Sequence, residues 1–268
     1  MLKKTKSLST LKGRREHGLF AVERTKIVSE FLKMPAYADN LEYVVATPKW
    51  YESETLRFNI DNDRHFKASP SEMERMSSLS TAADIIAVFR PPAIHDDIPN
   101  IEGTKLYIAL DRIQDPGNLG TIIRLADWFG VDTILTSHES ADSFNPKTIM
   151  ASMGSVARVN VVPCNLAETL TTARRNNIPV WGTFMSGESI YELPQTTAPV
   201  GILVMGNEGS GISPEITHCL SHRISIPAFP PGHTGAESLN VAMATSIILA
   251  EFRRRALLTY PNKDYGQN

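Results

Sequence analysis

The strongest constraint on the fold is a regular alternation of short apolar segments and helical segments from Lys105 onward. The apolar segments have strand length and read KLYIAL, TILT, VNVV, PVWGTF, GILVMG and RISIP. Helix starts are indicated between them at Asn145-Pro146, at Asn165 with Glu168 three residues later, and at Ser213-Pro214. This alternation predicts a parallel sheet covered by helices on both faces. In such sheets, ligands bind where strands end and loops lead into helices.

The first hundred residues predict a separate, smaller α/β unit. One helical face is formed by Ile27, Val28, Phe31 and Leu32, and the segments LEYVVAT and IIAVF read as strands. A capped helix start is expected at Ser69-Pro70-Ser71-Glu72. The segment Arg90–Gly103 is rich in proline and acidic residues and is the best linker candidate. We therefore expect one domain over residues 1–98 and a second over residues 99–268.

Composition excludes several classes of protein. No apolar run reaches the roughly 20 residues that a membrane span requires. The N-terminal stretch lacks the apolar core of a secretory signal, so a cytoplasmic location is expected. The two cysteines, Cys164 and Cys219, form no C-x-x-C motif, so neither a disulfide framework nor a zinc site is expected.

Basic residues are concentrated at the N-terminus although the whole chain has a net charge of −2. Residues 1–33 contain nine basic and three acidic side chains, an excess of six positive charges. Such an asymmetry predicts contact with a polyanion, and a solubilising basic tail is the alternative.

The first of three polar clusters, Asp111–Gly130, follows an apolar strand. A helix is expected to begin near Gly120, and the side chains of Asn118 and Thr121 are expected to accept hydrogen bonds from its free amides. Arg124 then lies early in that helix, where its planar guanidinium can bind a phosphate or orient an oxygen nucleophile. An ordinary loop followed by a surface arginine is the alternative.

The second cluster, Val204–Ser213, contains glycines in the order G-x-x-G-x-G. This is not the dinucleotide order, and no Walker lysine follows, so a nicotinamide or nucleoside-triphosphate site is poorly supported. The third cluster, Ile224–Arg255, is a proline-glycine loop followed by a long helix expected to begin near Ser238. The apolar stripe of that helix predicts either core or a subunit interface.

Together these clusters resemble the motifs of the SpoU (TrmH-type) family of SPOUT methyltransferases. The first family motif, Asn-x-Gly-x-x-x-Arg, is matched by Asn118, Gly120 and Arg124. The second, Gly-Asn-Glu-Gly-x-Gly, is matched by residues 206–211, and the third by Ile226-Pro227 with Ser238-Leu239-Asn240-Val241. The N-terminal segment KGRREHGLFAVERTKIV resembles the substrate-binding domain of the ribosomal-RNA branch. There are two departures: Arg24 replaces a usual glycine, and the loop AFPPGHTGAE is longer than usual.

The resemblance implies an S-adenosylmethionine-dependent RNA ribose 2′-O-methyltransferase without a metal. Its C-terminal α/β domain would be a trefoil-knotted parallel sheet that forms a homodimer, and its small N-terminal α/β domain would bind RNA. The implied catalytic group is Arg124, Asn118, Glu208 and Asn240. The implied cofactor-binding group is Thr183, Gly206, Asn207, Gly211, Ile226, Ser238 and Leu239. The expected RNA-binding group is Lys12, Arg14, Arg15 and Lys26.

The role of Arg124 has two readings. The family assigns it the activation of the ribose hydroxyl, but a pKa above about 12 makes arginine a poor base. Orienting the hydroxyl, alone or with the adjacent RNA phosphate, is physically easier. At the level of the whole protein, the alternatives are a non-catalytic RNA-binding or ribosome-assembly factor, a base methyltransferase, and action on transfer RNA.

Overall fold

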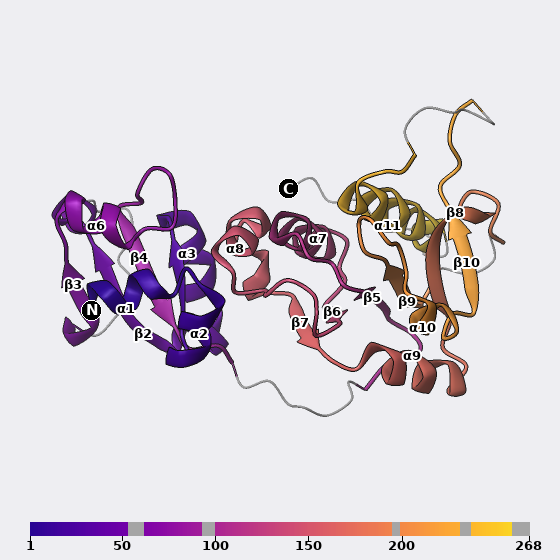
Figure 1. Ribbon diagram of the computed structural model, residues 1–268, viewed down its shortest axis with the longest axis horizontal. Coiled ribbons are helices and arrows are strands. Elements are labelled where there is room, and N and C mark those ends of the chain that lie inside the picture. The colour runs from indigo at the N-terminus through magenta and orange to yellow at the C-terminus, as the bar shows by residue number, and fades with distance from the viewer. Residues whose placement is uncertain (53–61, 93–99, 195–198, 231–236, 259–268) are drawn as a thin grey trace. The chain divides into compact units, whose positions relative to one another are not determined.

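The computed structural model describes residues 1–52, 62–92, 100–194, 199–230 and 237–258 (Figure 1). Its contacts divide the chain into two units: Met1–His95 with Asp142–Arg158, and Asp96–Ala141 with Val159–Asn268. The expected boundary between residues 98 and 99 falls outside the described residues, as do half of the expected linker and residues 231–236 of the long third-motif loop. The assignment of residues 142–158 to the first unit was not expected, because no change of composition marks that segment.

The first unit is built on a sheet with the strand order β1-β4-β2-β3. β1 and β2 pair antiparallel with β4, and β3 pairs parallel with β2. The strands are β1 (Phe20–Glu23), β2 (Leu41–Ala46), β3 (His65–Lys67) and β4 (Ile85–Phe89). The helices are α1 (Leu2–Ser7), α2 (Leu11–His17), α3 (Thr25–Leu32), α4 (Pro35–Ala38), α5 (Pro48–Glu52), α6 (Pro70–Met76) and α8 (Pro146–Ser152), with short 3-10 turns at Asn62–Arg64 and Ser155–Ala157.

The predicted elements of this unit are confirmed. α3 buries Ile27, Val28 and Phe31 on one face, as the spacing predicts. α6 begins with a complete capping box, in which Ser69 accepts from the amide of Glu72 and the Glu72 carboxylate accepts from the amide of Ser69. Reciprocal capping satisfies two backbone donors that the helix start would otherwise leave unpaired.

The second unit contains a six-stranded parallel sheet with the order β10-β8-β9-β5-β6-β7. Its strands are β5 (Leu106–Leu110), β6 (Thr133–Thr136), β7 (Asn160–Pro163), β8 (Val180–Ser189), β9 (Gly201–Met205) and β10 (His222–Ser225). Each of the six apolar segments noted in the sequence contributes one strand, which confirms the predicted architecture. The trefoil knot stays a prediction.

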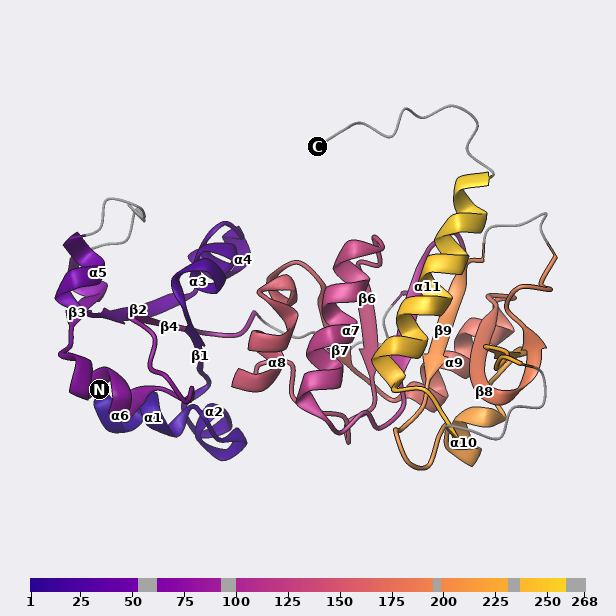
Figure 2. The same ribbon diagram turned by 90° about the horizontal axis from the view of Figure 1, so that it is seen from above.

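Helices cover both faces of this parallel sheet, as Figures 1 and 2 show. α7 (Pro116–Trp128) and α11 (Val241–Leu258) lie on one side, and α9 (Leu166–Arg175) and α10 (Pro214–Thr217) lie on the other. Tyr107 and Ala109 of β5 pack in one apolar cluster with Leu170 of α9 and Ile216 of α10. Because every residue of β5 is buried, the strand reads as a continuous apolar run rather than an alternating one.

Two helix starts differ from the prediction. α7 begins at Pro116 rather than near Gly120, because the Asp115 side chain accepts from the amide of Asn118 at 2.8 Å. Asn118 is therefore a helical residue whose side chain is free for other contacts. α11 begins at Val241, and Asn240 caps it by accepting from the amide of Ala242 at 2.9 Å. Among the described residues, no helix is long and apolar enough to cross a membrane.

Candidate active site

The three polar clusters meet at the carboxyl edge of the parallel sheet. β5 and β9 are neighbours with Leu110 paired to Met205, so Asp111 and Gly206 follow adjacent strand ends. The buried carboxylate of Asp111 accepts from the amide of Ser213 at 2.6 Å. This bond joins the end of β5 to the loop after β9. The topology thus brings together residues that lie about a hundred positions apart in the sequence.

Three predicted catalytic side chains form one hydrogen-bonded relay. Asn118 donates through Nδ2 to Oε1 of Glu208 at 2.9 Å. Asn118 Oδ1 accepts from Nδ2 of Asn240 at 3.0 Å. The Oδ1 of Asn240 in turn accepts from the first free amides of α11. Asn118 therefore binds both neighbours at once, because a carboxamide carries a donor and an acceptor on separate atoms of one planar group.

The side chain of Asn207 makes hydrogen bonds that hold the loop after β9 in place. Its Nδ2 donates to the carbonyl of Arg112 at 2.8 Å, and its Oδ1 accepts from the amides of Gly209 and Ser210, each at 3.0 Å. Its backbone pairs with Gly211 in both directions. The side chain of Asn207 thus holds the turn in shape, and its predicted role in binding the cofactor stays a prediction.

Two of the predicted glycines are required by the turn itself. A Cβ at Gly206 would stand 2.3 Å from the backbone of Gly211, a contact that real structures do not tolerate. Gly211 has a φ of +67°, in the left-handed region that favours glycine. Nothing lies within 4 Å of a Cβ built at Gly211, so its backbone faces open space. A ligand can therefore approach the turn closely on that side.

Arg124 is exposed and lies on α7 six residues after Asn118. Six residues correspond to about 9 Å along a helix, and helical side chains lean toward the helix N-terminus. Within the described part of the chain, no hydrogen bond or ion pair of Arg124 is found. Its guanidinium is therefore available to an oxygen or phosphate of a ligand.

The remaining predicted cofactor residues lie on neighbouring strands and on the loop before α11. Thr183 is on β8, and its hydroxyl donates to the carbonyl of Val204 on β9 at 3.1 Å. Ile226 directly follows β10 and is half-buried. Ser238 is exposed, and the Leu239 side chain is 52% exposed directly beside Asn240. An exposed large apolar side chain next to a polar relay fits a flat, partly apolar ligand group such as adenine.

The four residues expected to bind RNA lie on two helices of the first unit. Lys12 and Arg15 are exposed on α2, which precedes β1, whereas Lys26 is exposed on α3, which follows it. Arg14 is buried: its Nη1 donates to the carbonyl of Leu8 at 2.8 Å, and its Nε donates to Asp142 at 2.7 Å. Arg14 thus uses its guanidinium inside the protein and is not a surface RNA contact.

Sequence reasoning missed three residues that shape this site. Asp111 joins two motif loops, Asp115 caps α7, and Arg112 presents its carbonyl to Asn207 from a backbone with a φ of +58°. A usable signal existed for Asp111, since an acidic residue directly after a buried parallel strand is expected at the ligand-binding edge. The unusual backbone of Arg112 has no signal in the sequence.

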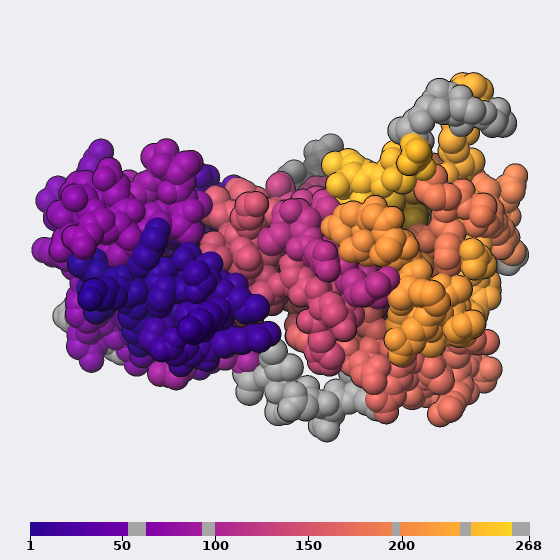
Figure 3. All heavy atoms as spheres, in the orientation of Figure 1, coloured from indigo at the N-terminus to yellow at the C-terminus, as the bar shows by residue number. Residues whose placement is uncertain are grey.

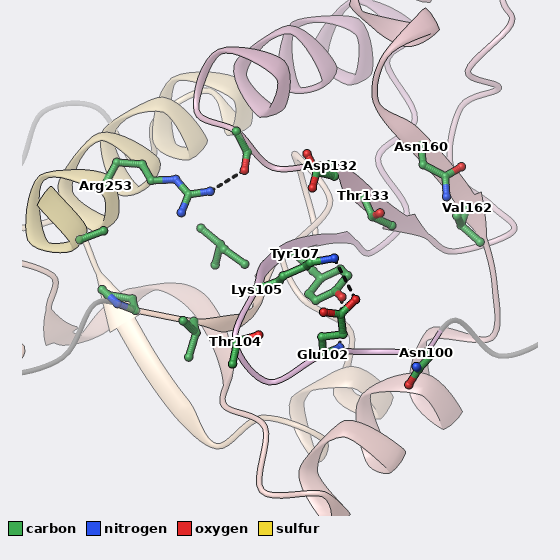
Figure 4. A pocket seen from close by; sticks show the side chains of 15 residues that line it. Asn100, Glu102, Thr104, Lys105, Tyr107, Asp132, Thr133, Asn160, Val162 and Arg253 are labelled. Atoms are coloured by element: carbon green, nitrogen blue, oxygen red, sulfur yellow. Dashed lines mark hydrogen bonds and ion pairs between the residues drawn. The ribbon is translucent and has the colours of Figure 1, made fainter. Parts of the chain in front are cut away.

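A separate cavity of about 480 Å³ opens at the opposite, amino-terminal edge of the sheet (Figure 4). Glu102 and Lys105 form an ion pair of 2.8 Å in its wall, to which Arg253 also contributes. None of the predicted catalytic or cofactor residues lines it. The cavity carries acidic and basic groups in equal measure, and it is not the site formed by the motif loops.

Comparisons with known proteins agree with this geometry. Residues 105–250 match the SpoU rRNA Methylase family. Over 253 residues the chain is 29% identical to the 23S rRNA (guanosine(2553)-2′-O)-methyltransferase RlmP of Bacillus subtilis, covering 94% of this chain and 95% of RlmP.

Two solved structures are similar over nearly the whole chain. An RNA methyltransferase of the TrmH family from Porphyromonas gingivalis matches with a TM-score of 0.80 and 41% identity, covering 95% of this chain and 97% of the other. An AdoMet-bound rRNA methyltransferase from Sinorhizobium meliloti matches with a TM-score of 0.77 and 28% identity, covering 94% of each chain.

Proposed function

Because the chain belongs to the SpoU rRNA methylase family, we propose that it transfers a methyl group from S-adenosylmethionine to a ribose 2′-oxygen of ribosomal RNA. The observation that carries this proposal is the relay Glu208–Asn118–Asn240, with the exposed Arg124 on the same helix as Asn118. The relatives' names, including a 23S rRNA 2′-O-methyltransferase, support ribose of ribosomal RNA as the target. We also infer a cytoplasmic location, where ribosomal RNA is found.

The residues present fit S-adenosylmethionine, which supplies an electrophilic methyl group on a sulfonium when bound. The glycine turn after β9, the end of β10 at Ile226 and the exposed Leu239 would hold it, with Thr183 on the strand between them. Among the described residues, no group of three or more histidine, cysteine, aspartate or glutamate side chains is placed to hold a metal ion.

The chain's own residues can orient the nucleophile. Arg124 can donate its parallel N–H groups to the ribose hydroxyl or to the adjacent phosphate and hold the oxygen in line. Asn118 is fixed by hydrogen bonds on both sides, so the helix that carries Arg124 is locked to the loops after β9 and before α11. Holding the reacting groups in one geometry is itself a large contribution to the rate.

We further propose that the protein is a homodimer through α7 and α11. These helices lie side by side, since Asn240 contacts Asn118 and Arg253 contacts Phe129. Their outer faces expose large apolar side chains, with Trp128 83% and Met243 58% exposed, and the surface of α11 is visible in yellow in Figure 3. Such apolar exposure is typical of a protein interface. In sedimentation experiments the wild-type protein should be a dimer and Trp128→Glu should be a monomer. A wild-type monomer would refute this assignment.

The experiment that tests the function compares three strains: one with the intact gene, one lacking it, and one producing Arg124→Ala. Mapping 2′-O-methyl positions in total RNA should reveal one ribosomal site that disappears in the last two strains. A lost site in transfer RNA, or a lost base methylation, would correct the substrate. An unchanged methylation pattern in the strain lacking the gene, together with no binding of S-adenosylhomocysteine by the purified protein, would favour the non-catalytic alternative.

A further inference from the structure

Three consecutive arginines near the end of α11 have three different environments. Arg253 donates to the carbonyls of Phe129 and Gly130 at 2.6 and 2.7 Å, at the C-terminal end of α7. Arg254 is exposed and binds Glu251 through two hydrogen bonds of 2.7 and 2.8 Å. Arg255 is only 1% exposed. The run is therefore not a single basic surface for RNA, and the buried member requires its own explanation.

Every nitrogen of the Arg255 guanidinium donates to a partner inside the second unit. Its Nε donates to Oε1 of Glu251 at 2.7 Å, and its Nη2 donates to the carbonyl of Ile190 at 2.6 Å. Its Nη1 donates to the carbonyls of Leu193 at 2.6 Å and Pro194 at 3.2 Å. Arginine stays charged when buried, so this arrangement is stable because each of its nitrogens has an acceptor and Glu251 neutralises its charge. The three carbonyls belong to one short segment, residues 190–194, directly after β8.

That segment is hydrogen-bonded to the end of β10. The amide of Ile190 donates to the carbonyl of Ser225 at 3.0 Å, and the hydroxyl of Ser225 donates to the carbonyl of Gly187 at 3.0 Å. Ser225 is the last residue of β10, and Ile226 follows it. A shift of the carbonyl of Ile190 would therefore be transmitted through a single hydrogen bond to the strand end that presents Ile226.

We propose that Arg255, held by Glu251, is a positioning residue for the cofactor: it fixes the ends of β8 and β10 and so shapes the wall that receives the adenosine portion of S-adenosylmethionine. This inference rests on the proposed function. Arg255 touches no reacting group itself. Its removal should weaken cofactor binding and leave the orientation of the ribose by Arg124 intact.

The test compares Arg255→Lys with Arg254→Lys in the full-length protein. Lysine keeps the charge but lacks the planar fork that reaches several carbonyls. Arg254 is the matched control, because it shares the same helix and the same Glu251 partner but contacts none of the three carbonyls. Arg255→Lys should raise the Kd of S-adenosylhomocysteine and the KM for S-adenosylmethionine by about 10- to 100-fold, the range expected when hydrogen bonds to a charged group are lost. Its kcat at saturating substrates should stay within about threefold of wild type, and Arg254→Lys should change neither parameter.

A purely structural role would give a different result. Affinity and KM at the wild-type level in a folded Arg255→Lys protein would overturn the proposal, as would a fall in kcat at unchanged KM. If Arg255→Lys does not fold, Glu251→Gln replaces it, since glutamine keeps an acceptor for Arg255 but removes the neutralising charge. Faster hydrogen exchange at the Ile190 amide with raised KM would support the proposal, and unchanged KM would overturn it. A wild-type protein that binds neither S-adenosyl compound would instead refute the proposed function.

Discussion

Replacing Asn118 by aspartate tests the relay at its centre with almost no change of shape. The new carboxylate would still accept from Nδ2 of Asn240, but its second oxygen would face Oε1 of Glu208, to which the amide now donates at 2.9 Å. A hydrogen bond to a charged group, worth about 1.5–3 kcal/mol, would be replaced by repulsion between two carboxylates. Because the site is open to solvent, that repulsion lies between the values for water and for a protein surface, about 1–4 kcal/mol.

The expected loss is therefore about 2.5–7 kcal/mol if both effects act on the transition state, or roughly 70- to 100,000-fold in kcat/KM. The assay is transfer of labelled methyl from S-adenosylmethionine to RNA at saturating RNA, with cofactor affinity measured separately by calorimetry. Asn118→Ala is the control, since it removes both hydrogen bonds without adding a charge and should lose less activity than Asn118→Asp. An Asn118→Asp enzyme within about threefold of wild type, or more active than Asn118→Ala, would refute the relay as a catalytic element.

Three other predictions concern separate parts of the chain. Arg124→Ala should abolish methyl transfer at nearly unchanged cofactor affinity, and Arg124→Lys should rescue it poorly because lysine lacks the planar fork; rapid turnover by either variant would contradict this. Replacing Lys12 and Arg15 together by alanine should weaken RNA binding and flatten its salt dependence in binding titrations at several salt concentrations. Arg14→Met should instead mainly lower the melting temperature in thermal unfolding, because Arg14 is bonded inside the protein. Hydrogen bonding from Arg254, reinforced by Arg255, lowers the pKa of Glu251 to about 2, so its stabilising contribution is present above the ordinary carboxyl pKa of 4.5 and is lost as the pH falls toward 2. Melting temperatures of Glu251→Gln and wild type should accordingly converge in that acid range, and a constant difference down to pH 2 would contradict the assignment.

The sequence alone predicted the architecture well because its signals are local. Six apolar segments and the start signals at Asn145, Asn165 and Ser213 depend only on neighbouring residues, and each is found in the structure. Parallel topology follows from the same alternation, since strands joined by helices must return to the same edge of the sheet. The three motifs also identified the family, because each motif stands directly after a strand and the motifs occur in a fixed order.

Only the tertiary structure decided how individual side chains are used. Arg14 and Arg255 look like surface residues in the sequence, yet both are buried, because Asp142 and Glu251 neutralise them and backbone carbonyls accept their remaining donors. The partners of Asn118 lie 90 and 122 positions away, so no local pattern could assign its two hydrogen bonds. Residue spacing determines which element forms. The charge that a neighbouring element brings determines whether a basic side chain meets solvent, RNA or the interior.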